Sequence, residues 1–299
     1  MAATATTWQL GRRTVRITHL DKLYWPGDGL TKGDLLQYYR DIAPVMLPYC
    51  LNRPATLRVF PNGIEGHSYY QRDRPARAPH WLRTVAYQTA TDEHLVHAIL
   101  IDDAAGLIWF ANTGALEFHL WSSRLPNLTE PDQVIFDLDP GDQATFSDVL
   151  QAALHLREAL DQLGLRGYPK TSGGRGLHVY LPLAPGHTFD GVRSWVKTLA
   201  EQLAARHPDL IAVAHGHTHR GRKVTIDHAQ NSIGRNTAAP YSVRALPRAP
   251  VSTPLSWEEV EDSQIHPTDL TLSVVPTRVR ARGDLFAPVL RGDQHLPAF

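Results

Sequence analysis

The sequence predicts an α/β (α+β) fold in which helices alternate with short strands. Its 299 residues can bury a large core. The hydrophobic and charged fractions, 42% and 20%, are typical of globular proteins. Segments with helical spacing alternate with short strand-like runs bounded by turn residues. We expect one compact unit over residues 1–299, with an N-terminal lobe (about 1–130) packed on a second lobe (about 131–299).

Composition excludes several classes of protein. Cys50 is the only cysteine, so we expect no intrachain disulfide and no cysteine-based zinc site, and Cys50 itself should be a small buried residue. No apolar run approaches the ~20 residues of a membrane helix, and the N-terminus lacks a signal-peptide core, so a cytoplasmic location is the default. Because 30 basic residues balance 30 acidic ones, any attraction to nucleic acid must be local.

The first half of the chain contains helical and strand-like segments in turn. A helix should begin at the capping residue Thr31. A turn at Pro61, Asn62 and Gly63 should join two strands into a hairpin. The predicted segments are a helix over Thr31 to Tyr49, strands over Arg53 to Phe60 and Gly66 to Arg72, a helix over Asp102 to Asn112 and a strand over Leu116 to Trp121.

The second half contains the clearest helix, with an apolar stripe that ends before Gly164. The last stretch, rich in Pro and Gly, should lie as a tail against the body. The predicted segments are strands over Gln133 to Asp139, Lys223 to Asp227 and Tyr241 to Leu246, helices over Phe146 to Leu163 and Phe189 to Arg206, two strands around the glycine turn of "YPKTSGGRGLHVYLPL", and a short helix from Ser256.

Two acidic residues share one face of the strand "QVIFDLDPG". The period of two places Asp137 and Asp139 together, opposite an apolar face. Two like charges at this spacing repel by about 1 kcal/mol or more, and a bound cation is the natural compensation. Carboxylate oxygens suit Mg²⁺ or Mn²⁺. The alternative is that Asp139 only starts the turn at Pro140 and that Asp142 caps the next helix.

A third acid ends the strand "KVTID", where Asp227 shares a face with Lys223 and Thr225. It would complete a carboxylate set for two metal ions, which can activate a hydroxyl and stabilise a leaving pyrophosphate. The glycine turn "KTSGGRGLH" suggests a phosphate cradle, with Ser172, Arg175 and His178 as further donors. The alternative for this turn is a glycine hairpin with a solvent-facing arginine.

The ordered series of these motifs resembles the polymerase domain of the bacterial end-joining protein ligase D, within the archaeo-eukaryotic primase superfamily. The matching stretches cover nearly the whole chain and include "LDKLYWPGDGLTKGDLLQYYRDIAPVMLPY", "NRPATLRVFPNGIEG", "GALEFHLW", "VIFDLDPG", "KTSGGRGLHVYLPL", "TIDHAQN" and "APYSVRALPRAPVSTPLSWEEV". The resemblance implies a primase-polymerase fold, with mixed and antiparallel sheets and flanking helices that form a central active-site cleft. Residues 131–299 would form its catalytic lobe.

The resemblance also implies roles for single residues. The catalytic metal ligands would be Asp137, Asp139 and Asp227. The nucleotide would be bound by Ser172, Arg175, His178, Arg244, His119 and Gln230. The DNA would be bound by Lys22, Lys32, Tyr69, Tyr70, Arg72 and Arg220, the two lysines gripping a 5′-phosphate and the two tyrosines facing template bases.

Several of these residues have simpler interpretations. The two lysines could be ordinary solvated side chains. Adjacent Tyr69 and Tyr70 point to opposite faces of a strand, so at least one should belong to the core. A lone His119 is more often structural than catalytic. The alternating histidines of "HGHTHR" could bind a metal or lie in a surface loop that presents Arg220.

The function expected from the resemblance is a template-guided, Mn²⁺- or Mg²⁺-dependent DNA/RNA polymerase. It would add nucleotides, preferably ribonucleotides, at DNA gaps or ends in double-strand-break repair. Its partners would be DNA with a 5′-phosphate, nucleoside triphosphates, and Ku with a separate DNA ligase, near the bacterial nucleoid. Alternatives are gap filling or priming in excision repair, a phosphoesterase using the same acids, and a non-catalytic module that binds 5′-phosphorylated DNA ends.

Overall fold

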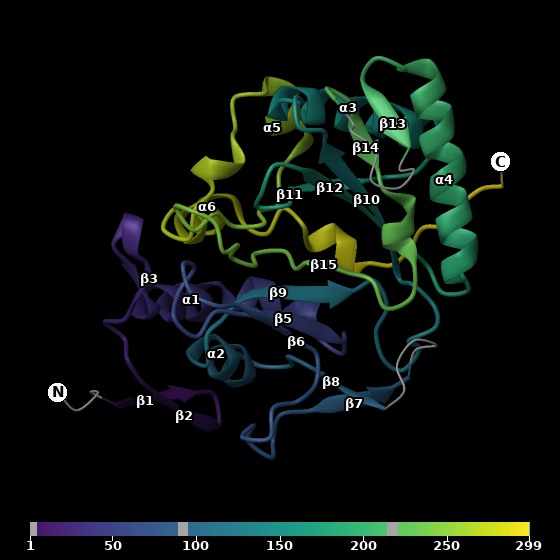
Figure 1. Ribbon diagram of the computed structural model, residues 1–299. Helices are drawn as coiled ribbons and strands as arrows, with labels where there is room; N and C mark the ends of the chain where they lie inside the picture. Colours follow the sequence, from purple (N-terminus) through teal and green to yellow (C-terminus); the bar gives the residue numbers. More distant parts are fainter. Residues whose placement is uncertain (1–4, 89–94, 214–220, 299) are drawn as a thin grey trace.

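A five-stranded sheet forms the upper half of the molecule in Figure 1, a computed structural model that describes residues 5–88, 95–213 and 221–298. The order across the sheet is β11 (Tyr168–Thr171), β12 (Leu177–Pro182), β10 (Gln133–Pro140), β14 (Val224–Ile226) and β13 (Ile211–Val213). Neighbouring strands run antiparallel, except that β13 and β14 are parallel. The strand that carries the acid pair, β10, therefore lies at the centre of this sheet.

Two long helices, α3 (Phe146–Gln162) and α4 (Phe189–Arg206), pack against this sheet and against each other. Both ranges agree with the predicted helices. The ring of Phe136 on β10 meets Trp195 of α4 edge to face, with centroids 6.3 Å apart. Helix α3 begins at Thr145, whose side chain forms a capping box with Asp148. The alternative that Asp142 caps this helix is therefore wrong.

A six-stranded sheet forms the lower half, with α1 (Lys32–Cys50) and α2 (Ala104–Asn112) beside it (Figure 1). Its path is β15 (Asn236–Ala238), β9 (Ala115–Trp121), β5 (Ala55–Val59), β8 (Val96–Ile99) and β7 (Thr84–Tyr87), and β6 (Tyr69–Gln71) pairs with β5. The β5–β6 hairpin confirms the predicted one. Strand β15, which follows β14 in the chain, pairs with β9 and so joins the C-terminal half of the chain to this sheet.

Helix α1 crosses the core although it contains Pro44 and Pro48. Thr31 caps its first turn as predicted, and Asp34 completes a capping box. The hydroxyl of Tyr39 donates to the carbonyl of Leu116 at 2.6 Å, which ties the helix to the start of β9. Cys50, at the end of the helix, is fully buried as expected. None of the helices in the described ranges is long and apolar enough to cross a membrane.

The remaining elements include several that the sequence did not predict. These unpredicted elements are the N-terminal hairpin of β1 (Thr6–Leu10) and β2 (Arg13–Ile17), the pair β3 (Leu23–Trp25) and β4 (Leu30–Thr31), helix α6 (Val275–Arg282), and the 3₁₀ turns η1 (Pro26–Asp28), η2 (His228–Asn231), η3 (Pro267–Asp269) and η4 (Ala287–Leu290). The short helix α5 (Trp257–Asp262), capped by Ser256, was predicted.

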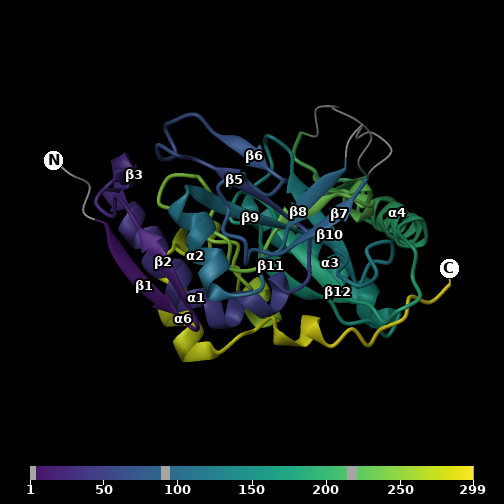
Figure 2. The ribbon, with the colours of Figure 1, turned by 90° about the horizontal axis from the view of Figure 1, so that it is seen from below.

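The predicted strand over Tyr241 to Leu246 is wrong. This segment makes only an isolated bridge between Val243 and Val251. Tyr241 has a φ of 68°, which lies outside the extended region and interrupts a strand. The segment is held in place by other bonds, because the hydroxyls of Tyr241 and Tyr49 both donate to Asp284 at 2.6 Å. Asp284 belongs to the C-terminal tail, which runs along one side of the body in Figure 2.

An ion cluster joins the two halves of the molecule. The guanidinium of Arg53, which is 3% exposed, makes two 2.6 Å bonds to the carboxylate of Asp132, just before β10. The same guanidinium donates to the carbonyl of Trp121 at the end of β9, and Arg124 also bonds Asp132. Asp132 therefore links β10 to the segments around β5 and β9.

Replacing this carboxylate should destabilise the whole fold. We expect Asp132→Asn to lower the free energy of unfolding by about 3 kcal/mol, because the charge of buried Arg53 loses its partner. Urea denaturation followed by circular dichroism measures the loss. The matched control is Asp190→Asn, since Asp190 is 89% exposed and its ion pair is with Arg193, three residues away. Equal stability of the two variants would contradict this role for Asp132.

Candidate active site

A cleft of about 440 Å³ opens between the two sheets. All the residues expected to bind metal or nucleotide line it, except Asp227. Its walls come from β9, β10, β12 and β15, the glycine turn and the segment around Arg244. The lining residues are His119, Asp137, Asp139, Pro140, Ser172, Gly174, Arg175, Gly176, His178, Gln230, Asn236, Thr237, Ala238 and Arg244.

The pairing of β10 with β14 brings the three predicted acids to one place in the sheet. Leu138 pairs with Ile226 and Asp139 with Thr225. The N–H of Asp227 donates to the carbonyl of Asp137 at 3.1 Å, which continues the ladder by one position. Residues that face each other across an antiparallel pair project from the same side of the sheet. The side of the sheet that faces the cleft therefore carries all three acids.

The carboxylate of Asp227 makes a structural hydrogen bond. It caps the 3₁₀ turn η2 by accepting a 2.9 Å bond from the N–H of Ala229. Within the described ranges, no three His, Cys, Asp or Glu side chains are grouped closely enough to hold a metal ion. The hard oxygens of Asp137 and Asp139 on the cleft wall suit a divalent cation.

The glycine turn is packed tightly between β10 and the segment at Val251. Gly173 has a φ of +74°, and a Cβ added there would lie 2.5 Å from Cγ of Arg244. A Cβ on Gly176 would lie 2.6 Å from the carbonyl oxygen of Leu138. The N–H groups of Gly174 and Gly176 both donate to Oγ of Ser172 at 3.2 Å. These two amides therefore orient the Ser172 hydroxyl and do not project into the cleft as an open cradle.

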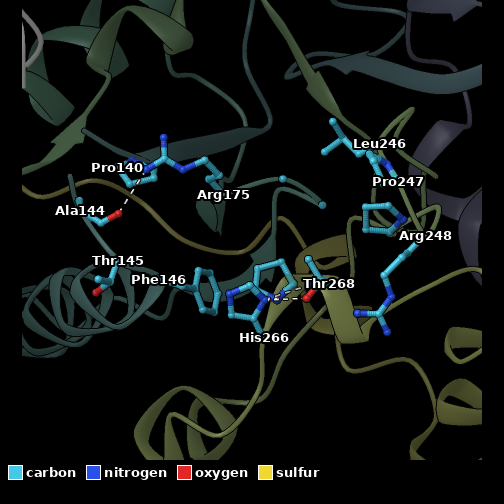
Figure 3. Close-up of a pocket in the computed structure, with 14 residues that line it drawn as sticks. Pro140, Ala144, Thr145, Phe146, Arg175, Leu246, Pro247, Arg248, His266 and Thr268 are labelled. Atoms are coloured by element: carbon cyan, nitrogen blue, oxygen red, sulfur yellow. Dashed lines mark hydrogen bonds between the residues drawn. The ribbon is translucent and has the colours of Figure 1, made fainter. Parts of the chain in front are cut away.

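Arg175 is bound to the loop after β10. Its Nη2 donates to the carbonyls of Gly141 at 2.9 Å and Ala144 at 3.2 Å, although the residue as a whole is exposed. Because the glycine turn joins the antiparallel strands β11 and β12, the alternative of a glycine hairpin with a solvent-facing arginine agrees with the structure. Figure 3 shows Arg175 on the wall of a second, mostly apolar hollow of about 650 Å³, with Phe146 and His266 on its floor. Arg175 thus separates this hollow from the cleft, which it also lines.

His178 lies on β12 beside the acid pair. Its Nε2 is 3.3 Å from Oδ1 of Asp137, and its Nδ1 is 2.9 Å from Nζ of Lys170. Burial, with the charges of Lys170 and Arg244 nearby, lowers the pKa of His178 well below its ordinary value. Lys170, which is 0% exposed, was not singled out from the sequence. Only the register of β11 with β12, which pairs Lys170 with His178, reveals this contact.

A second histidine, His119 on β9, is held by a buried carboxylate. Its Nε2 bonds Oε2 of Glu117 at 2.8 Å, and Glu117 is 1% exposed. Glu117 also accepts from the N–H of Ala245 and lies 3.4 Å from Nε of Arg244. These bonds to His119 and Ala245 and the charge of Arg244 lower the pKa of Glu117 to about 2, against the opposing effect of burial. Glu117 was not singled out from the sequence, since Ala245 and Arg244 come from a distant segment and only His119 is local.

The two lysines expected at a DNA 5′-phosphate lie next to each other. The N–H of Lys32 donates to the carbonyl of Lys22. Lys32 is 3% exposed, with its Nζ bonded to the carbonyl of Thr18, so its interpretation as a solvated lysine is wrong. Burial and the nearby charge of Lys22 lower its pKa to about 8. Nζ of Lys22 bonds the carbonyl of Pro61 and Oδ1 of Asn62.

The other expected DNA contacts lie on β6 and after it. Tyr69 and Tyr70 are 42% and 65% exposed, so the expectation that one belongs to the core is wrong. Strand β6 pairs with β5 in the six-stranded sheet. The ring of Tyr70 meets His119 edge to face at 6.5 Å, beside the cleft. Arg72, just after β6, is exposed, whereas Arg220 and the histidines of "HGHTHR" lie outside the described residues.

Comparison with known proteins shows the family to which this chain belongs. A family model described as "LigD, primase-polymerase domain" matches residues 31–286, which include both sheets and every described residue of the site except Lys22. The chain belongs to this family. The fold and the length of this chain can therefore be compared with those of other family members.

Relatives of the LigD primase-polymerase domain confirm the fold. The polymerase domain of ligase D from Mycobacterium tuberculosis, solved in complex with DNA, superposes with a TM-score of 0.87 at 32% identity, covering 92% of this chain and 98% of that one. The multifunctional end-joining protein LigD of Mycolicibacterium smegmatis is 32% identical over 94% of this chain. The bifunctional LigD of Bacillus subtilis is 31% identical over 95%. The chain spans 37% and 45% of these two curated relatives.

The buried Glu117 of this LigD primase-polymerase domain should make the fold sensitive to acid. A carboxylate whose pKa falls from 4.5 to about 2 on folding adds stability that is fully present above pH 4.5 and is lost as the pH falls through 2. We expect Glu117→Gln to lower the free energy of unfolding by about 3 kcal/mol at pH 7, since one pKa unit corresponds to ~1.4 kcal/mol.

Urea denaturation at a series of pH values tests this expectation. The difference between wild type and Glu117→Gln should narrow steadily between pH 4.5 and pH 2. Glu201→Gln is the control, because that side chain is 51% exposed on α4. A difference that stays constant over this pH range would show that Glu117 is not held as a stabilised anion.

Proposed function

We propose that this chain is a metal-dependent nucleotidyltransferase that adds nucleotides, preferentially ribonucleotides, to DNA at gaps or ends during non-homologous end joining. The observation that carries the proposal is the β10–β14 register, which brings Asp137, Asp139 and Asp227 to one face at a cleft. Membership of the LigD primase-polymerase family and end-joining relatives support it.

Polymerase domains of this kind generally use divalent metals. We assign the two ions, Mn²⁺ or Mg²⁺, to Asp137, Asp139 and Asp227. When bound, such ions lower the pKa of the attacking hydroxyl and neutralise charge on the leaving pyrophosphate. The protein's own contribution is to hold the carboxylates at the centre of a sheet, where Nε2 of His178 lies 3.3 Å from Oδ1 of Asp137.

Other residues that line the cleft supply donors for a triphosphate. Arg244, held by Glu117 and by the carbonyl of Ser172 at 2.6 Å, presents a cation in the same cleft as the acid pair. The hydroxyl of Ser172 already accepts two amide N–H groups, so its own hydrogen is free to donate to a phosphate oxygen. We assign nucleotide contacts to these residues and to Arg175, His178, His119 and Gln230, all of which line the same cleft.

The three acids Asp137, Asp139 and Asp227 also argue against the alternative of a non-catalytic module that binds DNA ends. Clustered carboxylates repel a polyanion, and a protein that only bound DNA would gain nothing from them. We infer that Lys22 and Lys32 bind a DNA 5′-phosphate, because two adjacent ammonium groups match its charge. Exposed Tyr69 and Tyr70 would stack on template bases, with Arg72 and Arg220 on phosphates. The M. tuberculosis domain was solved in complex with DNA, which supports DNA as a ligand of this chain.

The cellular setting is also a proposal. An end-joining polymerase unit would act at DNA breaks together with an end-binding factor such as Ku and with a DNA ligase, in the bacterial cytoplasm near the nucleoid. We further propose that residues 1–299 act as one catalytic unit in which a lobe of about 1–130 packs on a lobe of about 131–299. The β9–β15 pairing and the Arg53–Asp132 ion pair, both of which cross this division, support a single unit.

Removing one acid should abolish nucleotide addition. We expect purified protein with Mn²⁺ to extend the primer of a gapped duplex, and Asp137→Asn to reduce the rate about 1000-fold or more, because the metals supply several kcal/mol. Gel analysis of labelled primer measures the rate. Asp161→Asn, on the exposed surface of α3, should keep full activity. Equal extension by the two variants would refute the proposal, and primer shortening without addition would indicate a phosphoesterase.

The lysine pair should create a preference for 5′-phosphorylated gaps. We expect Lys32→Met to weaken binding to such a gap about 10- to 100-fold, because a charge-assisted bond to phosphate is lost. Binding to a 5′-hydroxyl gap should not change, nor should Lys197→Met affect either substrate. Since the pKa of Lys32 is about 8 in the free protein, the wild-type preference should decline as the pH rises above 8. Fluorescence anisotropy measures both effects, and an undiminished preference in Lys32→Met would contradict them.

A further inference from the structure

Lys170 is a fully buried cation that the proposed reaction does not use directly. It lies on β11, opposite His178 on β12, and its side chain is 0% exposed. Nζ is 2.9 Å from Nδ1 of His178 and 2.5 Å from Oγ of Ser252, and lies 5.5 Å from the ring centroid of Tyr180. Burying a lysine is costly unless its hydrogens have partners, so these contacts define what the side chain does.

The direction of each bond follows from counting donors and acceptors. The hydroxyl of Ser252 donates its hydrogen to the carbonyl of Thr171 at 2.8 Å, so Oγ of Ser252 accepts from Lys170. An ammonium group has three hydrogens and no lone pair, so it must also donate to Nδ1 of His178. A third hydrogen is left for the carbonyl of Thr171, 3.5 Å away.

The same assignment of donors and acceptors holds if Lys170 is neutral. Burial and the charge of Arg244 lower its pKa well below the ordinary value, and Asp137 opposes this effect. A neutral amine keeps two hydrogens, which match the two short contacts to Ser252 and His178. The reverse arrangement, with Nδ1–H donating to the amine, would leave the lone pair of Nε2 facing Oδ1 of Asp137 at 3.3 Å. Two acceptors at that distance repel each other.

We propose that Lys170 is a positioning residue that fixes His178 in the tautomer with its proton on Nε2. The ring then presents a hydrogen-bond donor to the cleft, toward Asp137 and toward any phosphate oxygen bound beside it. Lys170 acts from the far side of the ring and does not line the cleft itself. Partners of this kind orient the groups that touch a metal or substrate, and their loss typically reduces activity 10- to 100-fold.

The tautomer can be observed directly in the unmodified protein. We expect ¹⁵N–¹H correlation spectra of the full chain, labelled at histidine, to show His178 protonated at Nε2 and unprotonated at Nδ1. The signals are assigned by their disappearance in His178→Gln. In Lys170→Met the Nδ1–H form should become populated, whereas Lys197→Met should leave the spectrum of His178 unchanged. A wild-type His178 that carries its proton on Nδ1 would overturn the proposal, even if Lys170→Met failed to fold.

A kinetic test separates positioning from a purely structural tie to Ser252. We expect Lys170→Met to reduce kcat/KM for nucleotide addition about 10- to 100-fold. In a His178→Gln background the same change should cause no further loss, because Lys170 acts through His178. An equal loss in both backgrounds would show an independent role and overturn the proposal. The inference deepens the proposed function, but the spectra decide the tautomer even if the chain adds no nucleotides.

Discussion

The antiparallel pairing of β10 with β14 is the constraint on which the site depends. Asp137 and Asp227 are far apart in the chain, and the ladder from Leu138–Ile226 to the bond between Asp227 and Asp137 sets them opposite each other. A shift of one residue in this register would turn Asp227 to the side of the sheet that packs on α3 and α4. Burial of the apolar face of β10 therefore fixes the register and, with it, the position of the acids.

Charge balance shapes the walls around these acids. Buried Lys170 and half-buried Arg244 lie on the same side of the sheet as Asp137, and buried Glu117 in turn holds Arg244 and His119. Each charge is stabilised by a partner of opposite sign or by hydrogen bonds, as a low-dielectric interior requires. The cleft is thus an ordered set of donors and acceptors before any ligand binds. Preorganisation of this kind is what electrostatic catalysis needs.

Local patterns in the sequence predicted the main helices and central strands. Helical periodicity located α3 and α4, and the period of two in β10 placed Asp137 and Asp139 on one face. Features that depend on tertiary contacts were not predicted from the sequence. The role of Glu117 depends on Ala245 and Arg244 from a distant segment as well as on His119 of its own strand, and the role of Lys170 depends on His178 of the neighbouring strand. The irregular path at Tyr241 depends on its left-handed φ, which this residue type does not indicate. The glycine turn itself indicated Ser172, Arg175 and His178, whereas the resemblance to a family was needed for the other nucleotide residues and for the DNA residues.

The central claim is that Asp137 and Asp139 form one metal site with Asp227, which is distant from them in the sequence. It is tested most directly by a crystal structure of the protein soaked with Mn²⁺ and a nucleoside triphosphate, with the manganese located by anomalous scattering. The account predicts manganese bound by Asp137, Asp139 and Asp227, the last having turned from its bond to Ala229, with the triphosphate along the Ser172 turn. Manganese elsewhere, or bound without Asp227, would contradict it.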